Sequence, residues 1–424
     1  MTLALWDSEG FSYRDNHLYC EDAALDALAR RYGTPLYVYS RRAIETAYDA
    51  YDAALKGRDA QVCYAVKANS NLAVLDVLAR RGAGFDIVSG GELARVVAAG
   101  GKPDKTVFSG VGKTEAEIEA ALKANIACFN VESAAELDRI DAVAQRLQLR
   151  ARVALRVNPD IDAKTHPHIS TGLKNNKFGV AYGDALALGR VASARAGLQL
   201  MGIGCHIGSQ ITDIAPYIEA ADRIIDLVDS LEREKIVLRH IDMGGGLGIR
   251  YQNESPPQVP DLIKALLARL DARGHQTKQV LFEPGRSIVG NAGVLLTRVE
   301  YLKPGESKNF AIVDAAMNDL IRPAMYDAWM RVVPVMPRSN GVKQYDVVGP
   351  VCESADWLAR DRALALQPGD LLAITSAGAY AMTMSSNYNS RGRPAEIMVD
   401  GARSQCVRRR ETIEELFATE SLLS

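Results

Sequence analysis

The sequence is poor in cysteine, and its cysteines form no metal-binding or disulfide pattern. Six cysteines are scattered over 424 residues without a C-x-x-C pair. We therefore expect neither a disulfide framework nor a zinc site, and we assign no residue to a metal. Unpaired thiols fit the reducing cytoplasm best.

Neither sign of charge dominates, and long hydrophobic runs are lacking. Lys and Arg number 50 against 52 Asp and Glu, for a formal net charge of −2 at pH 7. This balance provides no basic surface for nucleic acid or for an anionic membrane. No apolar run reaches transmembrane length, and residues 1–13 contain no apolar core of signal-peptide length. We expect a cytoplasmic protein that acts on a small molecule and binds neither nucleic acid nor membrane.

Residues 35–290 alternate short apolar runs with amphipathic helical patterns. Short apolar runs are typical of parallel strands that are buried on both faces. Repeated strand–helix units indicate an α/β fold, and eight of them favour a closed, TIM-like (β/α)8 barrel. An open, doubly wound sheet is the alternative. The eight runs are Val62–Lys67, Gly84–Ser89, Thr106–Gly110, Ala127–Glu132, Arg152–Asn158, Leu200–Ile207, His240–Gly244 and Gln279–Glu283.

The pattern changes after residue 290. Short β-like runs are there separated by Pro-Gly turns. They predict a second, mostly β domain, either a β-sandwich or a β-barrel. A chain of 424 residues is long enough for a large barrel and this additional domain.

Polar residues follow several of the apolar runs, at ends that a barrel brings to one mouth. Lys67 follows Val62–Val66, and His206 follows Met201–Cys205. A lysine buried without a partner costs roughly several kcal/mol or changes its pKa. We therefore expect Lys67 to have a counter-charge or a covalent role. Taken alone, His206 is equally well a core histidine.

Glycine-containing turns follow the last two runs of the barrel pattern. Gly244–Gly246 comes after one run, and Glu283-Pro284-Gly285-Arg286 comes after the next. The loops after strands seven and eight of a (β/α)8 barrel commonly bind a phosphate group. Accessible backbone amides suit such a group. The two turns predict a phosphorylated ligand with Glu283 beside it.

These groups together match the needs of pyridoxal 5'-phosphate. Its aldehyde forms a Schiff base with an amine, which Lys67 supplies. Its phosphate takes backbone donors, its pyridine nitrogen needs a carboxylate such as Glu283, and its ring stacks on a flat partner such as His206. The sequence therefore predicts that the barrel binds this cofactor.

Longer motifs carry a resemblance to a known family. They are Tyr64–Asn69, Gly204–Ser209, Met243–Gly246, Glu283–Arg286 and Gly349–Asp356. The chain resembles the fold-type-III, alanine-racemase-like pyridoxal-phosphate decarboxylases from about Pro35 to Tyr388. Within that group, Thr165–Gly172 followed by Lys177–Gly179 is particularly similar to the diaminopimelate decarboxylase family.

The resemblance implies roles for individual residues. Lys67, His206 and Cys352 are catalytic by this comparison, with Lys67 as the Schiff-base lysine and Cys352 as the acid that returns a proton after carbon dioxide leaves. The implied cofactor-binding residues are Lys67, Asp86, His206, Ser209, Gly245, Glu283, Gly285, Arg286 and Tyr380. The resemblance also implies that residues 1–34 join residues 291–424 in one β domain. That domain contributes substrate-binding and dimer contacts, and Cys352 reaches the active site of a second subunit in a homodimer.

The substrate follows partly from chemistry. Racemases of this fold place an arginine against the pyridine nitrogen, whereas a carboxylate such as Glu283 maintains the electron sink that decarboxylation needs. The implied substrate-binding residues are Arg286, Arg322, Tyr326, Glu353 and Tyr380. The arginines suit the far carboxylate of diaminopimelate, and Glu353 suits its ammonium. The expected reaction converts meso-2,6-diaminopimelate to L-lysine and carbon dioxide, the last step of lysine biosynthesis.

Alternatives stay open at this point. A decarboxylase of the same fold could act on ornithine, arginine or a related amino acid. A catalytically silent homologue that binds a partner protein would be expected to lack Lys67 or Cys352, and both are present. The segment Asp160–Gly172, which contains the His166–Gly172 motif, is a lid over the barrel mouth or an inert excursion, and only the family likeness favours a lid.

Overall fold

The computed structural model describes residues 9–162, 172 and 176–423, which form two compact units. The barrel unit comprises Ala47–Ile249 and Ser255–Ser287. The β unit comprises Met1–Thr46, Arg250–Glu254 and Ile288–Ser424. The domain bounds and roles expected from the sequence stay predictions. Most of the expected lid, Asp160–Gly172, lies outside the described residues.

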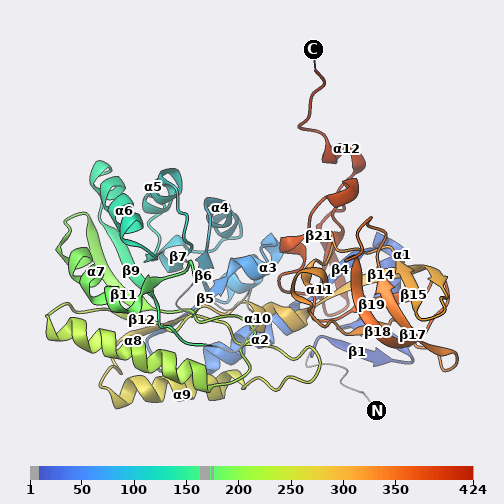
Figure 1. The fold of residues 1–424 in the computed structure, drawn as a ribbon, viewed down its shortest axis with the longest axis horizontal. Coiled ribbons are helices and arrows are strands. Elements are labelled where there is room, and N and C mark those ends of the chain that lie inside the picture. Colours follow the sequence, from blue (N-terminus) through green and yellow to red (C-terminus); the bar gives the residue numbers. More distant parts are fainter. Residues whose placement is uncertain (1–8, 163–171, 173–175, 424) are drawn as a thin grey trace. The chain divides into compact units, whose positions relative to one another are not determined.

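The barrel unit is built on a ring of parallel strands (Figure 1). Consecutive strands pair in parallel around the ring, and the pairing of β13 with β5 closes it. The expected (β/α)8 barrel is therefore confirmed, and the open doubly wound sheet is wrong. A short additional strand, β10 (Val180–Ala181), extends from β9. The eight strands of the ring are β5 (Ala60–Ala65), β6 (Gly84–Ile87), β7 (Thr106–Phe108), β8 (Cys128–Val131), β9 (Ala151–Asn158), β11 (Leu198–Gly204), β12 (His240–Asp242) and β13 (Gln279–Phe282).

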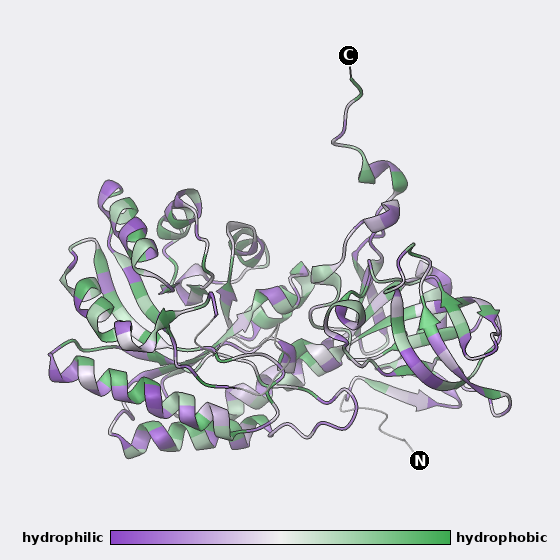
Figure 2. Cartoon of the chain, viewed as in Figure 1, coloured by the Kyte–Doolittle hydropathy of each residue, from purple (hydrophilic) through white to green (hydrophobic). Residues whose placement is uncertain are grey.

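Helices cover the outside of the ring, and their apolar faces explain why they pack there. In α8 (Ala215–Arg233), the buried residues Ile224, Val228 and Leu231 recur at spacings of three and four, which places them on one face of a helix. Figure 2 shows α8 and α9 with apolar and polar patches alternating along them. The other helices are α2 (Arg41–Ala54), α3 (Leu72–Arg80), α4 (Gly90–Ala98), α5 (Glu115–Lys123), α6 (Ala134–Arg146), α7 (Tyr182–Ala194), α9 (Val259–Ala272) and α10 (Arg286–Val289).

Small apolar side chains fill part of the barrel interior. Cys63, Cys128 and Leu281 belong to one buried cluster there. Burial raises the pKa of the Cys63 and Cys128 thiols, and that of Cys205, above the ordinary value. These thiols stay protonated at neutral pH and act as small packing residues.

The β unit contains a mixed β-sheet. Its strands come from β4 near the start of the chain and from the part of the chain that runs from β14 to β21. Its central strand, β14 (Gly293–Lys303), pairs with β4 and β19 through its first half and with β15 through its second half. The expected second, mostly β domain is therefore present as a mixed sheet. The other strands of the sheet are β4 (Leu36–Ser40), β15 (Asn309–Val313), β16 (Val332–Pro334), β17 (Val342–Val348), β18 (Trp357–Ala365), β19 (Leu371–Ile374), β20 (Ala395–Asp400) and β21 (Arg403–Arg408).

The N-terminal segment packs on this mixed sheet. It forms a small antiparallel sheet of β1 (Phe11–Arg14), β2 (His17–Cys20) and β3 (Ala23–Ala24), followed by α1 (Leu25–Tyr32). Its apolar side chains share one buried core with residues of β4, β14 and β20. That cluster includes Phe11, Leu18, Leu25, Leu36, Val294 and Ile397.

Neither a membrane-spanning helix nor a metal-binding cluster is found among the described residues. No helix among them is both long enough and apolar enough to cross a membrane. Within the same residues, no group of three or more His, Cys, Asp or Glu side chains is arranged to hold a metal ion.

Candidate active site at the barrel mouth

Lys67 and Asp86 form an ion pair at the carboxyl ends of adjacent strands. Ala65 of β5 pairs with Asp86 of β6, and Lys67 follows β5 in a short 3-10 turn, Val66–Ala68. Lys67 Nζ lies 2.9 Å from Oδ2 of Asp86, whose side chain is fully buried. Asp86 is therefore the counter-charge that the sequence led us to expect for Lys67. The Lys67 side chain is 37% exposed, which leaves its amine accessible to a reactant.

Glu283 is held by an amide from the opposite side of the barrel. Oε1 of Glu283 accepts a hydrogen bond of 3.0 Å from Nδ2 of Asn130, at the end of β8. The same Nδ2 donates to the Ser109 hydroxyl at 3.2 Å. A donated N–H favours the ionised form of a carboxylate. Asn130 thus fixes one oxygen of Glu283 and favours its negative charge.

Asp242 is a second carboxylate beside Glu283. It ends β12, is buried, and accepts a hydrogen bond of 2.8 Å from the backbone N–H of Gly244. Burial, and then the charges of Asp242 and Asp86, raise the pKa of Glu283 well above its ordinary value. Burial also raises the pKa of Asp242. Without a further cation, these carboxylates disfavour one another's ionisation.

His206 follows β11 and is neutral in this setting. Its Nδ1 accepts a hydrogen bond of 3.3 Å from the backbone N–H of Gly245. Burial, and then the positive charges of Arg156 and Lys67, lower the pKa of His206 well below its ordinary value. An uncharged, oriented imidazole offers a flat face, and a ring nitrogen that accepts an amide proton is consistent with this state.

The turn after β12 requires glycine at three successive positions. A Cβ atom on Gly244 would lie 2.3 Å from the backbone oxygen of Cys205. A Cβ atom on Gly245 would lie 2.0 Å from the backbone oxygen of Glu283, and one on Gly246 would lie 2.2 Å from that of Gly208. Gly246 also has φ of +100°, a conformation that L side chains rarely adopt. Backbone of the loops after β11, β12 and β13 thus approaches too closely for any side chain there.

Arg286 and Ser209 join two of these loops. Arg286 Nη2 donates a hydrogen bond of 3.0 Å to Oγ of Ser209, and the Arg286 side chain is buried. Gly285 precedes it, where a Cβ atom would lie 2.9 Å from Cβ of Ala68. The predicted residues Ser209, Gly245, Gly285 and Arg286 are therefore brought to one end of the barrel.

A small pocket opens among these strand ends. It is lined by Asn130, Leu155, Arg156, Gly204, Cys205, His206, Asp242 and Glu283. Arg156 is held in this lining by an ion pair of 3.0 Å with Glu132, a carboxylate that also accepts backbone N–H groups of Gly110 and Gly179.

The residues at the barrel mouth fit pyridoxal 5'-phosphate. An accessible amine lies on one side, and glycine turns with accessible backbone follow the seventh and eighth strands. The carboxylate cluster calls for a cation such as a protonated pyridine ring. Oδ1 of Asp86 is buried without a hydrogen-bond partner in the described part of the chain, so it can accept from a bound molecule.

Sequence reasoning misses Asp242 as a site residue. It precedes the glycine turn within an otherwise apolar run, and only its place at a strand end marks it. Asn130 is likewise marked in the sequence only by its place at a strand end. Its contact with Glu283 joins residues 153 positions apart, which the sequence alone does not reveal.

The other predicted site residues belong to the β unit. Arg322 begins α11 (Arg322–Tyr326), is buried, and lies with its guanidinium 4.7 Å from the centre of the Tyr251 ring. Cys352 is exposed, and its backbone N–H donates to Oδ1 of Asn389 at 3.0 Å. Glu353 accepts a hydrogen bond from the Tyr388 hydroxyl. Tyr380 has φ of +52° and Tyr326 is partly buried. That these side chains join the barrel residues in one site stays a prediction.

Comparison with known proteins decides the family. The family model for the pyridoxal-binding domain of pyridoxal-dependent decarboxylases matches residues 41–290. The diaminopimelate decarboxylase of Pseudomonas aeruginosa is 59% identical over 97% of this chain and 99% of its own length. That of Vibrio cholerae is 56% identical over 97% of this chain and 99% of its own length. The chain belongs to the diaminopimelate decarboxylase family.

Solved structures of this family share the whole fold. The diaminopimelate decarboxylase of Helicobacter pylori, complexed with L-lysine, matches with a TM-score of 0.90 and 44% identity, over 93% of this chain and 99% of that one. That of M. jannaschii, also with L-lysine, matches with a TM-score of 0.94 and 38% identity over 98% of both chains. The expected family and the expected cofactor, pyridoxal phosphate, are confirmed by these matches.

The raised pKa of Glu283 predicts that the free energy of unfolding of the cofactor-free protein depends on pH. In the cofactor-free protein, the folded state keeps a proton on Glu283 that the unfolded state loses above about pH 4.5. The free energy of unfolding of the wild type should therefore fall relative to that of Glu283→Gln as pH rises from that value. Denaturant unfolding of both proteins over a pH series measures the difference. If the free energies of unfolding of the two proteins changed with pH in parallel, the raised pKa of Glu283 would be contradicted. Added cofactor should stabilise the wild type more than the variant.

Proposed function

We propose that this chain uses pyridoxal 5'-phosphate to decarboxylate meso-2,6-diaminopimelate, giving L-lysine and carbon dioxide. The match to diaminopimelate decarboxylases over nearly the full length of the chain supports the proposal, as does the L-lysine in the solved relatives. The observation that carries it is the Lys67–Asp86 pair at the same barrel mouth as Glu283.

The cofactor, when bound, supplies an aldehyde that joins covalently to an amine and a protonated ring that accepts the electron pair left by a departing carboxylate. Lys67 provides the amine for the resting enzyme. Asp86 holds the Lys67 ammonium at the strand ends through their 2.9 Å contact, so the amine would stay beside the cofactor's aldehyde.

Glu283 holds the proton on the ring nitrogen. Its carboxylate needs a nearby cation, because burial, and then the charges of Asp242 and Asp86, raise its pKa, and the ring nitrogen would provide that cation. Asn130 favours the ionised form of Glu283 by donating to Oε1. We propose that the neutral imidazole of His206 stacks on the ring without competing for the proton.

The glycine turns and Arg286 bind the phosphate. The turns that contain Gly245 and Gly285 lie at the ends of the seventh and eighth strands, where a barrel commonly binds this group. Ser209 supports Arg286 through a hydrogen bond of 3.0 Å, so the guanidinium is held in one place. We assign Tyr380 to the phosphate side of the site as well.

The β unit recognises the far end of the substrate in this proposal. Arg322 binds the distal carboxylate, helped by Tyr326, and Glu353 binds the distal ammonium. The flat ring of Tyr251 against the Arg322 guanidinium restricts its motion, which lowers the entropy cost of binding. Cys352 then gives the proton on its Sγ to the carbon from which carbon dioxide has left.

Substrate choice is tested by carbon dioxide release from meso-diaminopimelate, ornithine and arginine, each incubated separately with the holoenzyme. We expect release from diaminopimelate alone, and a loss of roughly a thousandfold or more in Lys67→Ala. Lys56→Ala, which removes an exposed lysine of the same unit, is the matched control and should keep wild-type turnover. Release from ornithine without diaminopimelate would overturn the substrate, whereas turnover by Lys67→Ala would overturn the mechanism.

The proposal includes a homodimer in which Cys352 of one subunit serves the barrel of the other. Lys67→Ala and Cys352→Ala chains are each expected to keep only a small, measurable residual activity alone. Co-expressed in equal amounts, they should pair at random and recover roughly a quarter of wild-type activity, since each mixed dimer holds one complete site. Absence of recovery from isolated mixed dimers would show that each site is formed by one chain.

A further inference from the structure

The turn that carries Cys352 and Glu353 is held from two sides. On one side, the Asp356 carboxylate accepts backbone N–H groups of Met317 and Val351, each at 2.7 Å. On the other side, Asn389 accepts the N–H of Cys352 at 3.0 Å, and Tyr388 donates its hydroxyl to Glu353. The second set of contacts comes from a loop of the β unit that is distant in sequence.

That loop, Asn387–Arg391, is not stable by itself. Asn389 and Ser390 have φ of +55° and +53°, two successive non-glycine residues in the left-handed region. Such backbone is unfavourable and persists only when contacts around it hold it. The position of Asn389, and with it the bond to Cys352, therefore depends on what anchors the loop.

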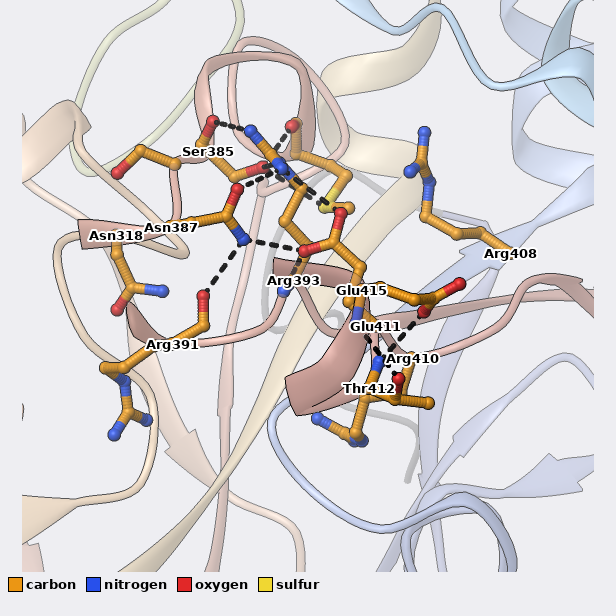
Figure 3. Close-up of polar contacts among 12 residues, drawn as sticks. Asn318, Ser385, Asn387, Arg391, Arg393, Arg408, Arg410, Glu411, Thr412 and Glu415 are labelled. Carbon is orange, nitrogen blue, oxygen red and sulfur yellow. Dashed lines mark hydrogen bonds and ion pairs between the residues drawn. The ribbon is translucent and has the colours of Figure 1, made fainter. Parts of the chain in front are cut away.

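Glu411 and Arg393 anchor it (Figure 3). Oε2 of Glu411 accepts Nδ2 of Asn387 at 2.7 Å and the backbone N–H of Arg393 at 2.8 Å. Nη1 of Arg393 donates to Oδ1 of Asn387 at 2.5 Å and to Oε1 of Glu411 at 3.1 Å. The Arg393 guanidinium also donates to Oγ of Ser385 at 3.1 Å, before the loop begins.

Glu411 is itself fixed by its neighbours in the C-terminal segment. Arg408, on β21, donates to the buried carboxylate of Glu396 at 2.7 Å. Arg410 donates to the backbone oxygen of Pro35 at 2.7 Å. Thr412 caps the short helix that follows, in a capping box with Glu415. Burial alone would raise the pKa of Glu411, but the donors from Arg393 and Asn387 outweigh it and lower the pKa, so the anchor is ionised at neutral pH.

We propose that Glu411 is a positioning residue for the Cys352–Glu353 turn, acting through Arg393 and the Asn387–Arg391 loop. It touches neither Cys352 nor Glu353 in the contacts described above. The inference rests on the proposed function, which gives Cys352 its role as proton donor. It extends that function to the C-terminal segment, whose ionised carboxylate would set the place of an acid far away in sequence.

Glu411→Ala removes both carboxylate oxygens of the anchor, which accept from Asn387 and Arg393. We expect kcat with meso-diaminopimelate to fall by roughly ten- to a hundredfold, because small misplacement of a reacting group has effects of that order. KM should change much less. The kcat of Glu411→Gln should lie between those of the wild type and Glu411→Ala. The carbonyl oxygen of its side chain still accepts from Arg393, but its NH2 group cannot accept from Asn387. Glu414→Gln, which neutralises an exposed carboxylate of the same segment, is the control and should retain wild-type kinetics.

Alkylation of Cys352 provides a readout that general destabilisation would not move. In the holoenzyme, peptide mass spectrometry follows iodoacetamide labelling of Cys352, with the exposed Cys406 as internal reference. Loss of the anchor should raise the labelling rate of Cys352 by roughly threefold or more relative to Cys406, because the turn opens locally. Asn389→Gly keeps the left-handed backbone but removes the contact to Cys352, so it should reproduce both effects if Glu411→Ala does not fold.

A double-variant cycle separates this inference from the proposed function. If Glu411 acts through the turn, Glu411→Ala in a Cys352→Ala background should cause no further loss of kcat. Additive losses, or unchanged kcat and labelling in Glu411→Ala or Asn389→Gly, would overturn the inference. Full turnover by Cys352→Ala alone would instead overturn the role of Cys352 in the proposed function.

Discussion

The electrostatic balance around Glu283 is the constraint on which the rest of the barrel mouth depends. Asp86, Asp242 and Glu283 lie at the carboxyl ends of three strands of one ring. Burial and their mutual repulsion raise the pKa values of Asp242 and Glu283. Lys67 compensates Asp86 directly. The remaining negative charge is compensated only if another cation enters the site, and a protonated pyridine ring is a cation that the cofactor of this family brings. In the proposed function, the protein thus selects the ring in the electronic state that decarboxylation needs.

The backbone of three neighbouring loops is closely packed beside this cluster. Carbonyl groups of neighbouring loops occupy the space that side chains at Gly245 and Gly246 would need. His206 accepts the N–H of Gly245, so the flat imidazole and the glycine turn are fixed to each other. Rigid loops at the ends of rigid strands explain how a site composed of residues far apart in sequence keeps its geometry.

The sequence predicted the barrel well because its strands are short apolar runs bounded by polar residues. The run Leu200–Ile207 shows the limit: β11 ends at Gly204, and Cys205 and His206 belong to the following loop. Lys67 likewise lies in a turn after β5. Periodicity locates such elements but does not fix their ends, which depend on pairing with neighbours.

Other features could not be predicted because they depend on contacts between distant segments. Asn130 gains its importance only when the ring closes and brings it to Glu283. In the β unit, β15 pairs in parallel with β17, and β4 pairs in parallel with β20, arrangements that hydropathy does not encode. The anchor at Glu411 depends on the same kind of pairing, since β21 brings the C-terminal segment alongside β20.

The central claim is that Glu283 keeps the ring nitrogen of the bound cofactor protonated. Nitrogen NMR of the holoenzyme, prepared with pyridoxal phosphate labelled with ¹⁵N in the ring, measures this state directly. The account predicts the chemical shift of a protonated pyridine nitrogen in the wild type at neutral pH. A shift typical of an unprotonated ring nitrogen would contradict it.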